Sequence, residues 1–145
     1  MAALAESQVV ELLGGRAVLG RLSKSEGLVQ AVRRGLPYAA LEALTRILGL
    51  DIGEIGRVVG IPERTLARRK HQRALSPTES DRLYRIAFIT QLASTTLGSV
   101  QAARAWMARV NRSLGGVTPM SLLDTDIGSR QVEGALLRLS HGIYA

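Results

Sequence analysis

Positive charge is concentrated in one short stretch of this 145-residue chain. Six of its 19 Lys and Arg residues fall between Arg57 and Arg73, where Glu63 is the only acid, and the net charge of the whole chain is +7. Such a dense run of cations attracts a polyanion, and DNA is the polyanion that we expect. The alternative is an exposed helix face whose charges are solvated.

Other reactive residue types are scarce or badly placed for catalysis. There is no cysteine, which excludes thiolate zinc sites and cysteine nucleophiles, and the two histidines, His71 and His141, lie far apart in the sequence. Asp124 and Asp126 flank Thr125 ahead of a helix, where Asp126 is better explained as an N-cap than as half of a catalytic pair. The glycine-rich turns lack the G-x4-GK[ST] phosphate loop. We therefore expect a protein that is not an enzyme and holds no cofactor and no metal.

The composition favours an all-α fold. Apolar residues make up 46% of the chain but aromatic residues only 3%, so the core must consist of Leu, Ile, Val and Ala, which pack well between helices. No apolar run approaches the roughly 20 residues that span a bilayer. The first residues do not resemble a signal peptide, and the lack of cysteine suits a reducing compartment. We expect a cytoplasmic protein without a membrane partner.

Glycine and proline divide the chain into segments whose apolar residues recur every three or four positions. The clearest helix start is Ser76-Pro77-Thr78-Glu79, because Ser76 and Glu79 can exchange hydrogen bonds in a capping box. The segments predict short helices at residues 7–13, 25–34, 38–48, 52–59, 63–73, 77–97, 99–113, 119–123 and 127–140.

The helices at residues 52–59 and 63–73 have the spacing of a pair joined by a tight turn. Ile55 and Val59 share one face of the first helix, and Leu66 faces the same core from the second. Gly56 leaves room for the second helix to approach, and Gly60 can adopt the left-handed conformation that reverses the chain. This order of residues resembles the helix-turn-helix family over about twenty residues.

In that family the second helix reads DNA. Because Leu66 points inward, Arg64, Arg68 and His71 project to the opposite side at about 100° per residue and should face the groove. Arginine is the side chain best suited to bidentate recognition of guanine. Glu63, near the start of the helix, could accept a hydrogen bond from a cytosine amine.

The other polar residues of this helix are expected to contact the DNA backbone, namely Thr65, Arg69, Lys70 and Arg73. Arg69 departs from the family pattern, which usually has a buried aliphatic residue there. Its methylene stem could pack while its guanidinium reaches a phosphate. Since helix-turn-helix proteins usually present two reading helices one DNA turn apart, we expect a homodimer or higher oligomer on operator DNA.

The C-terminal part carries a second ordered pattern. Trp106 and Val110 lie four apart on an expected helix face, Gly115 and Gly116 should stop that helix, and Thr118 begins a short one. The order W-x4-N-x2-LGG-x-TP-x2-LL-x-T, followed by G-x3-V-x3-L-x2-L-x-HG, resembles the toxin-binding domain of Xre/ParS-type antitoxins. Together with the helix-turn-helix, this resemblance covers nearly the whole chain.

This resemblance implies an antitoxin of a RES-Xre toxin-antitoxin pair. Such antitoxins repress their own operon as oligomers and bind a RES-domain toxin that destroys NAD. The family's extreme C-terminus blocks the toxin's active site, which here implies toxin contacts by Gly142, Ile143, Tyr144 and Ala145, with Arg138 and His141 nearby. In physical terms, large apolar residues in such a tail make good anchors in a partner's pocket.

Two alternatives remain open for the C-terminal part. Ile143 and Tyr144 could fold back onto the protein's own core. The chain could also be a stand-alone dimeric regulator whose C-terminal helices serve dimerisation or sensing. The expected organisation is an N-terminal helical segment at 1–36 for packing or dimer contacts, a helix-turn-helix domain at 37–97 and a toxin-binding domain at 98–145, with Gly98 as a hinge.

Overall fold

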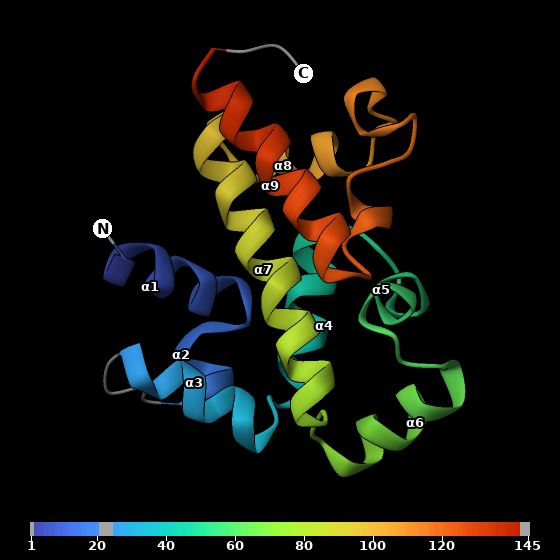
Figure 1. Cartoon of the computed structure of the whole chain (residues 1–145). Helices are drawn as coiled ribbons and strands as arrows, with labels where there is room; N and C mark the ends of the chain where they lie inside the picture. Colours follow the sequence, from blue (N-terminus) through green and yellow to red (C-terminus); the bar gives the residue numbers. More distant parts are fainter. Residues whose placement is uncertain (1, 21–24, 143–145) are drawn as a thin grey trace. The chain divides into compact units, whose positions relative to one another are not determined.

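The computed structural model describes residues 2–20 and 25–142, and over these ranges the chain forms α-helices and two short 3-10 helices without any strand (Figure 1). The all-α prediction is confirmed. The chain divides into two compact units, one that ends at Ala87 and one that begins at Phe88. The longest helix, α7 (Pro77–Leu97), contributes residues to both units. The domain limits that we predicted at residues 36 and 97 stay a prediction.

The first unit consists of a series of short helices and the first turns of α7. The helices are α1 (Ala2–Leu12), α2 (Gly15–Leu19), α3 (Ser25–Arg34), α4 (Tyr38–Leu48), α5 (Ile52–Val59) and α6 (Glu63–Gln72). The predicted bounds of α3 to α6 agree with these to within one residue. The sequence pattern missed α2, because a helix of five residues is too short to show periodicity. The predicted start of the first helix, at residue 7, was too late, because α1 begins at Ala2.

The core of the first unit is formed by buried residues from several helices, among them α4, α5 and α7. Leu41 and Leu44 from α4, Ile55 from α5, and Leu83 and Ile86 from α7 are fully buried. Truncating a buried residue of this kind to alanine typically costs about 2–5 kcal/mol of stability. The first helix of the helix-turn-helix and the start of α7 therefore belong to one packed body.

The second unit contains the remainder of α7 and a set of shorter elements. They are α8 (Val100–Met107), η1 (Arg112–Leu114), η2 (Met120–Leu122) and α9 (Asp126–Ser140). The helix predicted at 99–113 was too long. The reason is Asn111, whose side chain accepts a hydrogen bond from the Ser113 amide at 2.9 Å and whose own amide donates to Val117 at 2.9 Å.

This early helix end changes two sequence predictions. Val110 lies outside α8 and is 60% exposed, so its predicted pairing with Trp106 on a helix face is wrong. Gly115 ends η1, with a backbone φ of 81°, and not the longer helix that we expected. The N-cap of α9 is Thr125, whose Oγ1 accepts from the Gly128 amide at 2.9 Å, and not Asp126.

Candidate nucleic-acid interface

The turn between α5 and α6 has the geometry that its residues predicted. Gly60 ends α5 with a φ of 81°, in the left-handed region that favours glycine. A Cβ on Gly56 would lie 2.8 Å from Cδ1 of Leu66, so a larger residue at position 56 would force this buried side chain to shift. Val59 and Leu66 are both buried beside this turn. Leu66 of α6 thus packs closely against α5 at this turn.

The start of α5 is stabilised by hydrogen bonds between Asp51 and Glu54. The side chain of Asp51 accepts from the Glu54 amide at 2.8 Å, and the Glu54 carboxylate accepts from the Asp51 amide at 3.4 Å, which completes a capping box. The Glu54 amide is the main cause that lowers the pKa of the Asp51 carboxyl. The anchored α5 gives α6 a stable support.

The outer face of α6 carries the residues that we expected to read bases. Arg64, Arg68 and His71 are exposed, and Leu66 on the opposite side is buried. Neither Arg64 nor Arg68 forms an ion pair in the described part of the chain. Their guanidinium groups can therefore donate to a partner, and a guanine edge offers the two acceptors that match this fork.

The flanks of α6 carry the remaining predicted DNA contacts. Glu63, Lys70 and Arg73 are exposed and Thr65 is partly exposed. Arg73 ends α6 in the left-handed conformation, with a φ of 64°, and its carbonyl accepts from the Tyr38 amide at 3.1 Å. The α6 end is thus attached to the start of α4, and its side chains remain at the surface.

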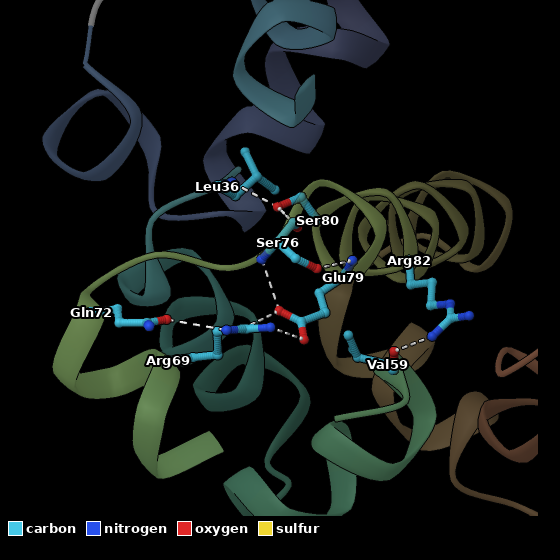
Figure 2. A network of polar contacts seen from close by, with 8 residues as sticks. All are labelled: Leu36, Val59, Arg69, Gln72, Ser76, Glu79, Ser80 and Arg82. Carbon is cyan, nitrogen blue, oxygen red and sulfur yellow. Dashed lines mark hydrogen bonds and ion pairs between the residues drawn. The ribbon is translucent and has the colours of Figure 1, made fainter. Parts of the chain in front are cut away.

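Arg69 forms an ion pair inside the protein. Its Nε donates to Oε1 of Glu79 at 2.8 Å and its Nη2 donates to Oε2 at 3.2 Å, while Nη1 donates to Gln72 at 3.1 Å (Figure 2). The Arg69 side chain is only 19% exposed. Three of the five guanidinium N–H groups of Arg69 are thus engaged inside the protein, and its expected phosphate contact stays a prediction.

Glu79 is held as an anion by this pair. Burial opposes the ionisation of Glu79, but the hydrogen bonds from Arg69 and from the Ser76 amide outweigh it and lower the pKa of the carboxyl below its ordinary value. The hydrogen bond with Glu79 raises the pKa of Arg69 in turn. Ser76 and Glu79 also form the predicted capping box, with contacts of 2.8 and 3.1 Å.

Two further residues at the start of α7 attach it to other parts of the unit (Figure 2). Oγ of Ser80 accepts from the Leu36 amide at 2.7 Å, ahead of α4. Nη1 of Arg82 donates to the Val59 carbonyl at 3.3 Å, at the end of α5. The four residues 79–82 of α7 therefore contact α6, α5 and the segment before α4. Sequence reasoning missed Glu79, Ser80 and Arg82 in this role, and only the capping box hinted at Glu79.

The toxin contacts implied by the C-terminal resemblance are described only in part. Arg138, His141 and Gly142 are exposed at the end of α9. Ile143, Tyr144 and Ala145 lie outside the described residues. The toxin contacts at these positions stay a prediction, and in the sequence they lie far from α6.

Within residues 2–20 and 25–142, no three His, Asp or Glu side chains gather closely enough to hold a metal ion. No helix in those ranges is long and apolar enough to cross a bilayer.

Two family models match the chain. The antitoxin Xre-like helix-turn-helix domain matches residues 27–87, and the antitoxin Xre/MbcA/ParS C-terminal toxin-binding domain matches residues 92–142. The first range contains the α5–α6 element and the Arg69–Glu79 pair. The second contains α8 and α9. The resemblance inferred from the sequence is thereby confirmed.

Curated relatives agree with the family models. The chain is 30% identical over 125 residues to an antitoxin Xre of Yersinia enterocolitica, covering 85% of this chain and 84% of the relative. It is 32% identical over 116 residues to an antitoxin Xre of Photorhabdus laumondii, covering 79% and 78%. An antitoxin Xre of Pseudomonas putida is 40% identical over 83 residues, covering 57% and 52%. The chain therefore belongs to the Xre family of antitoxins, whose role is regulatory and not enzymatic.

Proposed function

We propose that this chain neutralises a RES-domain toxin that destroys NAD, and that it represses its own operon as a homodimer or higher oligomer. The observation that carries the proposal is the presence of two domains in one chain. A helix-turn-helix with free arginines on its outer face is followed by a match to a toxin-binding domain. An oligomer of this kind would place two reading helices one DNA turn apart.

In the neutralising step, the last four residues of the chain enter the toxin's active site and exclude its substrate. Gly142 is exposed after α9, with a φ of 76°, so the chain can change direction there. Arg138 and His141 precede it on the exposed end of the helix. Ile143 and Tyr144 supply the apolar groups that would fill the pocket.

In the repressing step, Arg64 and Arg68 read base edges, with His71 beside them. Glu63, Thr65, Lys70 and Arg73 contact the edges of the groove or the phosphates. If a dimer makes on the order of eight phosphate contacts, its affinity for DNA should fall by about three to five decades between 50 and 200 mM salt. A flat salt response would argue against DNA as the partner.

The experiment that tests the proposal is co-expression with the product of the neighbouring gene. Expressed alone, that product should stop growth and deplete cellular NAD. Co-expression of this chain should restore both, and the two proteins should purify together. A neighbouring product that is harmless alone and does not co-purify would favour the stand-alone regulator instead.

A further inference from the structure

The outer face of α9 exposes large apolar side chains. Ile127 is 70% exposed and Leu137 is 46% exposed, although both are large aliphatic residues within a helix. At about 100° per residue the two lie on the same side of the helix, opposite the buried Val132 and Leu136. Nothing in the described part of the second unit covers this face.

A glycine occupies the middle of the same face. Gly134 lies inside α9, where glycine costs about 1 kcal/mol relative to alanine. A Cβ built on it would meet only Nη1 of Arg138, at an ordinary contact distance of 3.5 Å. Gly128 is different, because its Cβ would overlap the Leu122 carbonyl oxygen. The helix therefore needs glycine at 128 for its own packing, and it has no such need at 134.

We infer that the outer face of α9 is a docking surface for the toxin, and that Gly134 forms a notch in which a toxin side chain contacts the helix backbone. This inference rests on the proposed function. The face belongs to the segment that matches a toxin-binding domain, and it leads within one turn to the tail proposed to enter the active site. A toxin that holds the tail lies beside the end of α9.

The charged residues of this face indicate which groups the toxin surface should carry. Arg130 is paired with Asp126 through Nε and Oδ2 at 2.8 Å. Arg138 is exposed and has no ion pair among the described residues. The complementary toxin surface is then apolar opposite Ile127 and Leu137, with an acidic group opposite Arg138. The face supplies affinity and the tail supplies inhibition.

The test measures the binding of full-length variants to the purified product of the neighbouring gene. Gly134→Gln fills the notch, and we expect about a tenfold or greater loss of affinity. The same change should raise the thermal midpoint, because glutamine forms helix better than glycine. A purely structural role for Gly134 would not combine these two effects. Ala105→Gln adds the same side chain at an exposed position of α8, outside the proposed face of α9, and should leave affinity unchanged.

The possible outcomes separate the inference from the proposed function. If the unchanged chain binds the toxin and Gly134→Gln binds it equally well, the docking surface is wrong. If Gly134→Gln turns an oligomer into a monomer in sedimentation, the face belongs to a second copy of the chain, which also overturns the inference. Failure of the unchanged chain to bind would overturn the proposed function and this inference with it.

Discussion

Arg69 of α6 and Glu79 of α7 are joined by a two-point ion pair, with N–O distances of 2.8 and 3.2 Å. The pair connects the second helix of the helix-turn-helix to the helix that continues into the second unit. We propose that it affects DNA binding in two ways, because it restrains the rotation of α6 and engages Nε and Nη2 of Arg69 inside the protein.

Glu79→Gln should lower the selectivity of DNA binding without lowering the affinity for random sequence. The variant weakens the hold on α6, so base contacts by Arg68 lose their alignment, while the freed Arg69 can contact a phosphate. Titrations with operator and scrambled duplexes measure both affinities. A parallel fall in both would show that the pair serves stability alone.

The same variant should unfold more easily at neutral pH, by about 1–2 kcal/mol, because hydrogen bonds to a charged group are lost. The folded-state pKa of Glu79 lies below its unfolded value of 4.5, so this stabilisation is fully present above pH 4.5 and is lost as the pH falls through the folded pKa. Urea unfolding of both proteins between pH 3 and pH 7 measures the difference. A gap between the two proteins that stays constant down to the most acidic point would contradict the ionic role of Glu79.

Arg68→Ala and Lys70→Ala should have different effects on DNA binding. Arg68→Ala should remove about 1–3 kcal/mol of discrimination between operator and non-operator sequence. Lys70→Ala should weaken both by a similar factor and reduce the salt slope by about one. Binding titrations at several salt concentrations separate the two effects. Unchanged selectivity in Arg68→Ala would remove this residue from base reading.

Gly56→Ala should destabilise the helix-turn-helix by about 1–3 kcal/mol, because its Cβ would press on the buried Leu66. Leu66→Ala opens a cavity at the same point and is also destabilising. The double variant should be more stable than the sum of the two single costs predicts, since the added methyl group then has room. Thermal unfolding of all four proteins tests this, and strict additivity would mean that the two residues do not contact.

The features that could be predicted from the sequence are those set by residues close to one another in the chain. The turn at Gly60 and the capping box at Ser76 each depend on residues within a few positions of one another, so spacing alone indicated them. The bounds of α3 to α6 could be predicted for the same reason, because they depend on neighbouring residues.

Contacts between residues far apart in the chain could not be predicted from the spacing of residue types. Arg69 and Glu79 meet only because the chain reverses between α6 and α7, and Ser80 reaches an amide 44 positions earlier. The end of α8 was misjudged because Asn111 competes with the helix through its side chain, an effect that apolar spacing does not reveal.

We propose that the C-terminal tail inhibits the toxin. This is tested by measuring NAD consumption by the purified product of the neighbouring gene, with the full-length chain or with a chain that lacks residues 142–145. Full-length protein should abolish NAD consumption. The shortened protein should still bind through α9 yet leave most of the activity intact. Complete inhibition by the shortened protein would contradict the claim.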